Sequence, residues 1–201
     1  GFLNEINKAN LNDSLKYILN SNFIIEKRMS LKININNDDS LVHYSLNDVV
    51  IDNGSSPRAL QFNVFLSEYF LNTYISDGII FCTPTGSTAY AMSNGCPIVS
   101  PQSNVICIVP IAPHSYGQRS VIINNTDTIT IKVNKKSIES SQVTYDGANN
   151  LTIENPNDIF IKKASRQLQI IHPCNYNYFN VLSKKLRYDM VYPHHEPYLN
   201  K

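Results

Sequence analysis

The sequence predicts a mainly β protein, folded as a β-sandwich or a related all-β layer, with one helix near each end. Short apolar segments recur at spacings of roughly 8–12 residues, and several of them alternate apolar with polar residues. Turn-forming pairs such as Asn53-Gly54 and Asp146-Gly147 separate these segments. Hydrophobic residues make up 42% of the 201 residues and charged residues 16%, so the chain can build a core.

The expected elements follow one another along the chain. In the first helix, Leu15, Ile18 and Leu19 share one face, and either Asn12 or Asp13 can cap its start. The segment 105–111 is apolar throughout, which indicates a strand buried on both faces. The other predicted elements are strands at 29–35, 46–51, 62–66, 79–82, 121–123, 129–133, 143–145, 159–161 and 168–171, and a helix at 178–187.

Charge and cysteine usage exclude several classes of protein. The net charge is +1 and the basic residues are scattered, so we expect neither a nucleic acid nor an anionic membrane as partner. No apolar run approaches the roughly 20 residues that span a bilayer, and no signal peptide is visible. Cys82, Cys96, Cys107 and Cys174 form no C-x-x-C pair, which predicts free thiols in a cytoplasmic protein, without disulfide or zinc site.

The segment from Asp77 to Ser93 reads DGIIFCTPTGSTAYAMS and is the most informative stretch of the chain. An apolar strand is followed by a hydroxyl-rich loop, Thr83 to Thr88, and good helix formers then resume. Such a loop presents N–H groups and hydroxyls to a nucleotide or phosphate. No lysine follows Gly86, so this is not a Walker A loop. The alternative interpretation is a plain capped helix start.

Other polar positions beside predicted strands also have two interpretations each. Asn47 and Asp48 form either an Asx turn at an edge strand or an amide and a carboxylate that bind ribose hydroxyls. Asp77 and Asp146 each precede a glycine, as turn residues do, although Asp77 lies close to the hydroxyl-rich loop in sequence. His114 lies in the loop PIAPHS, where it serves as a base or as a structural hydrogen-bonding group. The histidines lack metal-ligand spacing, so no metal ligand is expected.

Taken in order, these motifs resemble the NAD kinase family along nearly the whole chain. The most diagnostic of them is the block DGIIFCTPTGSTAYAMSNGCPIVSP at 77–101. The other matching segments are GFL at 1–3, EKR at 26–28, LNDVVI at 46–51, PIAPHS at 110–115, YDG at 145–147 and IHPCNYNYFNVLSKKL at 171–186.

The resemblance implies a two-domain kinase, with an N-terminal α/β domain and a β-rich, sandwich-like C-terminal domain, of which this chain is essentially the second. We expect residues 1–28 to be a remnant of the first domain, with the helix at about 12–20. Residues 29–171 would form the β-rich NAD-binding domain. Residues 172–189 would return to the first domain, and residues 190–201 would be a polar tail.

The function implied by the resemblance is phosphorylation of the adenosine ribose 2′-hydroxyl of NAD, with ATP or polyphosphate as donor and Mg²⁺. A cytoplasmic homodimer or homotetramer is expected. The family's GGDG motif, whose aspartate is the expected general base, does not occur in these residues. We therefore expect that aspartate upstream of Gly1 and the chain as given to be an incomplete, inactive fragment. The alternatives are a non-catalytic NAD(P)-binding module and, less favoured by these motifs, a related lipid kinase.

The resemblance also implies roles for individual residues. The chain departs from the family at Asp48, where many members have Glu, at Ala148, where Gln is common, and at Cys96, where Gly is usual. Ala112 and His114 are expected at the rim of the site or in a neighbouring subunit's site. The implied NAD-binding residues are Asn47, Asp48, Arg58, Asp77, Thr85, Thr88, Ala89, Tyr90, Ser93, Asp146 and Ala148.

Overall fold

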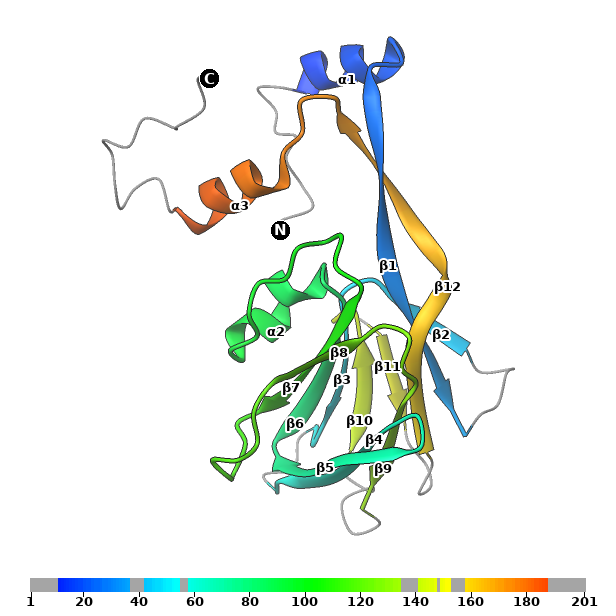
Figure 1. Cartoon of the computed structure of the whole chain (residues 1–201), viewed down its shortest axis with the longest axis vertical. Helices are drawn as coiled ribbons and strands as arrows, with labels where there is room; N and C mark the ends of the chain where they lie inside the picture. The colour runs from blue at the N-terminus through cyan, green and yellow to red at the C-terminus, as the bar shows by residue number, and fades with distance from the viewer. Residues whose placement is uncertain are drawn as a thin grey trace. The chain divides into compact units, whose positions relative to one another are not determined.

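The structure is a computed structural model, shown in Figure 1, and it describes residues 11–36, 42–54, 58–134, 141–147, 149–152 and 158–187. The motif at 1–3, Ala148 and the expected tail at 190–201 lie outside these residues. The chain divides into two compact units. One comprises Lys27–Leu168, and the other comprises Gly1–Glu26 with Gln169–Lys201.

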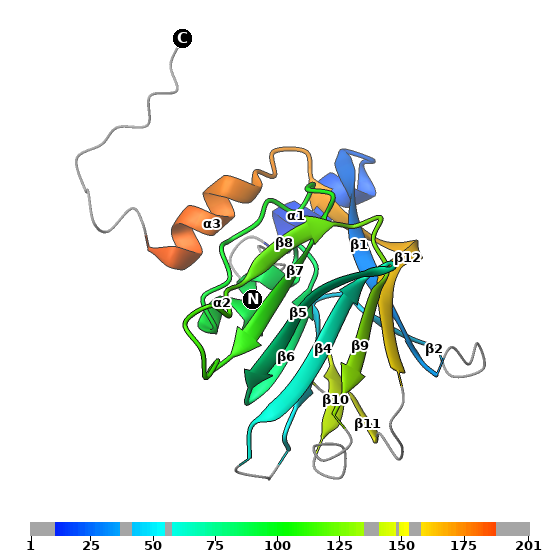
Figure 2. The ribbon, with the colours of Figure 1, turned by 60° about the horizontal axis from the view of Figure 1, so that its bottom comes forward.

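Two antiparallel sheets of six strands each make up most of the larger unit, as the strand spacing predicted (Figures 1 and 2). The first sheet has the order β2 (Val42–Ser45), β1 (Phe23–Ile35), β12 (Asp158–Pro173), β9 (Ile129–Val133), β4 (Leu60–Leu66) and β5 (Tyr69–Ser76). The second sheet has the order β11 (Asn149–Thr152), β10 (Gln142–Tyr145), β3 (Asp48–Asp52), β6 (Gly78–Cys82), β7 (Val105–Ile111) and β8 (Val121–Asn124).

The core lies between the two sheets, and the alternation of side chains along each strand explains the sequence pattern. On β6, Ile79 and Phe81 belong to the core between the sheets, whereas Ile80 and Cys82 belong to a second apolar cluster on the opposite face. β7 repeats this alternation. Both strands are therefore buried on both faces, which is why their sequences are continuously apolar.

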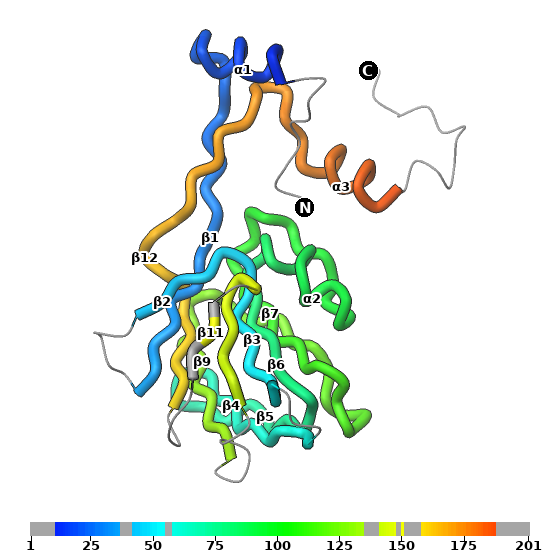
Figure 3. Tube along the Cα trace, turned by 180° about the vertical axis from the view of Figure 1, so that it is seen from behind, coloured from blue at the N-terminus to red at the C-terminus, as the bar shows by residue number. Residues whose placement is uncertain are grey.

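A short helical segment covers the outer face of the second sheet. It consists of the 3₁₀ turn η1 (Gly86–Thr88) and the helix α2 (Tyr90–Ser93), and Figures 1 and 3 both place α2 beside β6 and β7. Ala91 is fully buried in the second apolar cluster, together with Val99 from the chain that follows. This packing fixes the hydroxyl-rich loop above the ends of β3 and β6.

The smaller unit contains α1 (Leu11–Leu19) and α3 (Tyr178–Leu186). Both helices were predicted, but the expected apolar face of α1 is exposed, with Leu19 80% accessible. The side chain of Asn177 caps α3 by accepting hydrogen bonds from two backbone N–H groups. His172 pairs with Glu26 at 2.9 Å, and both side chains are buried. Among the described helices, none is long and apolar enough to cross a membrane.

The sequence did not predict β2, β5 and β11. The two strands predicted at 159–161 and 168–171 are parts of the single strand β12. β12 is continuous through residues 162–167, which are mostly polar, because it runs beside β1 along its length. β5 follows β4 through a tight turn in which Ser67 has a positive φ of 53°. The turn carries no glycine or proline, so no strong local signal marks it. β2 and β11 have four residues each and are mostly polar, with the sequences VHYS and NNLT, so neither forms an apolar run.

Candidate functional site

The hydroxyl-rich loop is held in place by Thr83, the first residue after β6. Its hydroxyl donates a hydrogen bond of 2.6 Å to the carbonyl of Leu46 and accepts one of 3.1 Å from the N–H of Gly86. Its backbone N–H donates to the carbonyl of Asn47 at 2.9 Å. The loop is therefore bonded directly to the turn that precedes β3.

Gly86 brings the loop and this turn into direct contact. A Cβ atom at this position would lie 2.0 Å from the carbonyl oxygen of Asn47 and 2.5 Å from its carbonyl carbon. Real Cβ atoms do not approach other atoms so closely. The glycine of the TPTGST segment is thus required by a close backbone approach and not by a positive φ.

The hydroxyl groups of the loop mainly build the loop itself. Ser87 is fully buried, donates to the carbonyl of Pro84 at 2.7 Å and accepts from the N–H of Val99 at 2.9 Å. Thr88 donates to the carbonyl of Thr85 at 3.1 Å. Neither η1 nor α2 has a side-chain cap at its N-terminus, so this segment is not a plain capped helix start. It is a rigid turn that sets the direction of α2.

Asp146 organises the turn before β3. Its carboxylate accepts hydrogen bonds from the N–H groups of Leu46, at 2.8 Å, and Asn47, at 2.7 Å, and from the hydroxyl of Ser45, at 2.8 Å. Asp146 has a φ of 49° and begins a turn with Gly147, whose φ is 70°. Asp146 therefore forms a turn with Gly147 and also anchors the turn before β3 through its carboxylate.

Asp48 is a buried carboxyl group beside the start of α2, with 4% of its surface exposed. Burial raises its pKa from 3.8 to about 6, and the negative charge of Asp146 adds to this effect. A hydrogen bond from the backbone of Tyr90 acts in the opposite direction, lowering the pKa. Asp48 consequently changes its charge near pH 6, in contact with the first residue of α2.

The structure separates the predicted site residues into two groups at opposite ends of β6. In the register of β3 and β6, Asp48 faces Cys82 and Asp52 faces Gly78. The five residues of β6 span roughly 17 Å. At the Cys82 end or in the segment that follows lie Asn47, Asp48, Thr85, Thr88, Ala89, Tyr90, Ser93 and Asp146; at the Gly78 end lie Arg58, Asp77, Ala112 and His114.

The Gly78 end has its own set of contacts. Asp77 and His114 are both about half exposed, and their side chains approach to 3.5 Å between Oδ1 and Nε2. The backbone N–H of Asp77 donates a hydrogen bond to the carbonyl of Ile111, and the N–H of His114 donates one to the carbonyl of Ile75, each at 3.0 Å. The side chain of Asn53 reaches the Arg58 carbonyl at 3.1 Å. Nearness in sequence between Asp77 and the hydroxyl-rich loop thus does not become nearness in space.

Several residues outside the predicted set also shape the site. Arg28 is 2% exposed and donates to the Thr85 hydroxyl at 3.2 Å. The Ser45 hydroxyl shares its single proton between two acceptors, the Asp48 carbonyl at 2.7 Å and the Asp146 carboxylate at 2.8 Å. A basic residue next to a run of alternating apolar positions was a usable signal for Arg28. No local signal marks Ser45, because its partner lies 101 positions away.

Comparison with known proteins supplies a family for this arrangement. Residues 46–173 match the ATP-NAD kinase C-terminal domain family. The NAD kinase of Wigglesworthia glossinidia brevipalpis is 41% identical over 187 residues, which are 92% of this chain and 63% of that protein. The NAD kinase of Caldanaerobacter subterraneus subsp. tengcongensis is 37% identical, over 92% of this chain and 66% of that protein. The chain therefore spans slightly less than two thirds of the curated relatives it matches.

Solved structures share the fold. A yeast NADH kinase complexed with NADH superposes with a TM-score of 0.85 and 23% identity, covering 100% of this chain and 59% of that one. An NAD kinase from Archaeoglobus fulgidus in complex with ATP gives a TM-score of 0.76 and 21% identity, covering 93% and 70%. At such identities the likeness concerns the arrangement of the strands.

Proposed function

The chain belongs to the NAD kinase family, and we propose that the whole protein transfers a phosphoryl group from ATP to the adenosine ribose 2′-hydroxyl of NAD, giving NADP. The observation that carries this proposal is the meeting of three matched motifs at one end of the second sheet. The turn at Asn47 contacts the loop at Gly86 and is held by Asp146. Polyphosphate remains an alternative donor.

In this proposal the described residues hold NAD. Asn47 and Asp48 bind the ribose or the adenine edge, and Tyr90, which is 49% exposed, lies beside a base. Thr85, Thr88, Ala89 and Ser93 line the same region. Asp146 acts indirectly, because its carboxylate already accepts three hydrogen bonds from the turn. The proton of the 2′-hydroxyl would pass to the aspartate of a GGDG motif, which these 201 residues do not contain.

The described residues do not suit Mg²⁺ as an all-protein site. The one group of three potential metal ligands found among them consists of cysteine thiols, and Mg²⁺ prefers oxygen ligands. We propose that the metal arrives with ATP and is held largely by its phosphates, as is common for kinases. The described cysteines are free, which suits a cytoplasmic enzyme.

Arg58, Asp77, Ala112 and His114 require a different explanation. They lie roughly 17 Å from the loop along β6, so within one chain they do not share its site. We propose that they contact NAD bound to a second copy of the chain, in a homodimer or homotetramer. Dissociation into monomers would then weaken NAD binding while leaving the loop intact.

The direct test is NADP formation by the full-length protein from NAD, ATP and Mg²⁺, together with NAD binding by calorimetry. Tyr90→Ala should weaken NAD binding by about tenfold, since stacking on an aromatic ring is worth about 1–3 kcal/mol per base. Tyr69→Ala is the matched control, because Tyr69 is 80% exposed and begins β5 of the first sheet. NAD binding without NADP formation would identify a non-catalytic NAD(P)-binding module, and phosphorylation of a lipid would identify a lipid kinase.

A further inference from the structure

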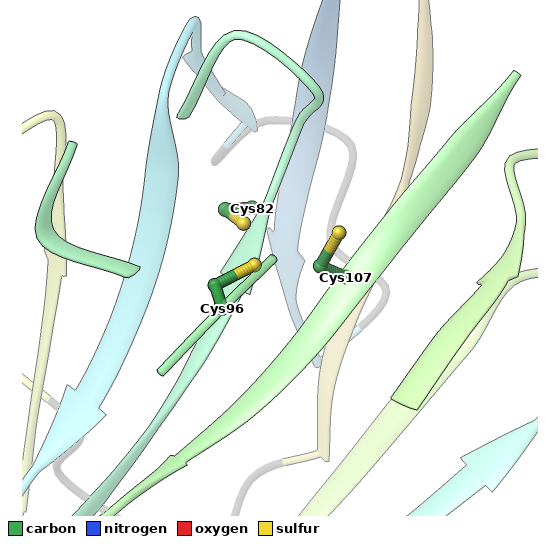
Figure 4. A group of neighbouring side chains, drawn as sticks. All are labelled: Cys82, Cys96 and Cys107. Atoms are coloured by element: carbon green, nitrogen blue, oxygen red, sulfur yellow. The ribbon is translucent and has the colours of Figure 1, made fainter. Parts of the chain in front are cut away.

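Three buried cysteines meet beneath the hydroxyl-rich loop. Cys82 ends β6, Cys107 faces it across the sheet on β7, and Cys96 comes from the chain after α2. Their sulfur atoms all lie within 4.8 Å of one another, and the three side chains are at most 6% exposed (Figure 4). This cluster plays no part in the function proposed above.

The sulfur spacing suits one ion bound by three ligands. Three sulfurs that each lie about 2.3 Å from a central ion are at most about 4 Å apart, as in thiolate complexes of soft metals. Shifts of less than about 1 Å would bring the present spacing to that value. Cys82 and Cys107 are fixed by the sheet, whereas Cys96 lies in a segment without regular structure and can make the adjustment.

The surroundings of the cluster discriminate between soft ions by charge. Its neighbours are the side chains of Val50, Ile80, Ala91, Val99 and Val109, which form one apolar cluster with the thiols. Three thiolates around Cu⁺ would carry two negative charges and around Zn²⁺ one, and zinc also seeks a fourth ligand. Burying such a charge without a partner is strongly unfavourable. A trivalent ion with three thiolates is neutral.

We propose that Cys82, Cys96 and Cys107 form a binding site for a soft trivalent ion, with arsenic(III) as the probe. The reaction is As(OH)₃ + 3 RSH → As(SR)₃ + 3 H₂O. Three As–O bonds break, three As–S bonds form, and each thiol proton leaves with a hydroxide as water. No group is oxidised or reduced, and the net charge is zero before and after.

The bound ion would restrain the segment that forms one side of the candidate NAD site. Cys82 immediately precedes the loop at Thr83, and Cys96 follows α2 by three residues. One ion would therefore tie both ends of the loop segment to each other and to β7. Because it binds only the folded arrangement of the three thiols, it should also raise the free energy of unfolding.

The test is titration of the full-length protein with arsenite, in a phosphine reductant free of thiols. Bound arsenic is counted by plasma mass spectrometry after gel filtration, and thermal unfolding is followed in parallel. We expect one arsenic per chain and a higher unfolding midpoint, both unchanged in Cys174→Ser, whose thiol is exposed. Cys96→Ser and Cys107→Ala should each weaken binding by more than about 100-fold, exceeding the loss typical of an outer-shell partner.

Two further measurements keep the outcome decisive. Circular dichroism of each variant before titration shows whether it folds, and Cys96→Ser is the less demanding change because Cys96 lies outside the sheet. Full arsenic binding by folded Cys96→Ser, or loss of binding in Cys174→Ser, would overturn the proposal. So would tighter binding of Zn²⁺ or Cu⁺ than of arsenite, because the argument from charge would then be wrong.

Discussion

Gly86→Ala tests whether the contact between the loop and the turn before β3 determines the site. The added methyl group would lie 2.0, 2.5 and 2.9 Å from the O, C and Cα atoms of Asn47. These are backbone atoms and cannot rotate away, so the loop must move outward. Gly86 is not among the positive-φ glycines, so the effect arises from steric contact alone.

The expected loss in the free energy of unfolding follows from the contacts that such a movement strains or breaks. Overpacking a close contact costs about 1–3 kcal/mol. The two hydrogen bonds from Thr83 to Asn47 and Leu46, at 2.9 and 2.6 Å, contribute about 1 kcal/mol each. We expect the free energy of unfolding to fall by about 3–5 kcal/mol, which for a chain of 201 residues lowers the melting midpoint by roughly 10 °C.

Urea denaturation followed by circular dichroism gives the loss of stability, and calorimetry gives NAD affinity under conditions where the variant is folded. Gly117→Ala is the matched control, because nothing lies within 4 Å of its added Cβ and its φ is ordinary, so its stability should change by less than about 0.5 kcal/mol. If Gly86→Ala kept both the stability and the NAD affinity of the unsubstituted protein, the close approach would have no structural role.

The remaining predictions concern the two carboxylates. Folded Asp48 keeps its proton up to about pH 6, whereas in the unfolded chain it ionises near pH 4, so stability falls as the pH rises through this interval. Asp48→Asn should remove this pH dependence of the free energy of unfolding, measured by urea denaturation at several pH values. At pH 7.5 the variant should be more stable than the unsubstituted protein by up to about 3 kcal/mol and should bind NAD more weakly. An unchanged pH dependence would contradict the raised pKa of Asp48. Asp146→Ala should cost about 2–4 kcal/mol, since it leaves the N–H groups of Leu46 and Asn47 without their partner, and equal stability would contradict its role as an anchor.

The sequence predicted the architecture well where side-chain periodicity is regular. The segments 105–111 and 129–133 coincide with β7 and β9, because each strand has one buried face, or two, along its whole length. The sequence was least informative where polar residues interrupt the apolar pattern, as in β12 and β2. For the site, it identified the hydroxyl-rich loop and the turns at Asn47 and Asp146 as special, from residue types that ordinary strands avoid.

Residue type and periodicity, which are local properties of the sequence, thus predicted most of the strands. Short motifs in a fixed order carried the family resemblance. Which motifs meet was decided only by the pairing of distant strands. The register of β3 with β6 brings Asn47 to Gly86 and leaves Asp77 at the other end of the strand. The register of β6 with β7 sets Cys82 opposite Cys107, while packing of α2 adds Cys96. Such contacts arise from closing long loops around a common core, and no local pattern in the chain encodes them.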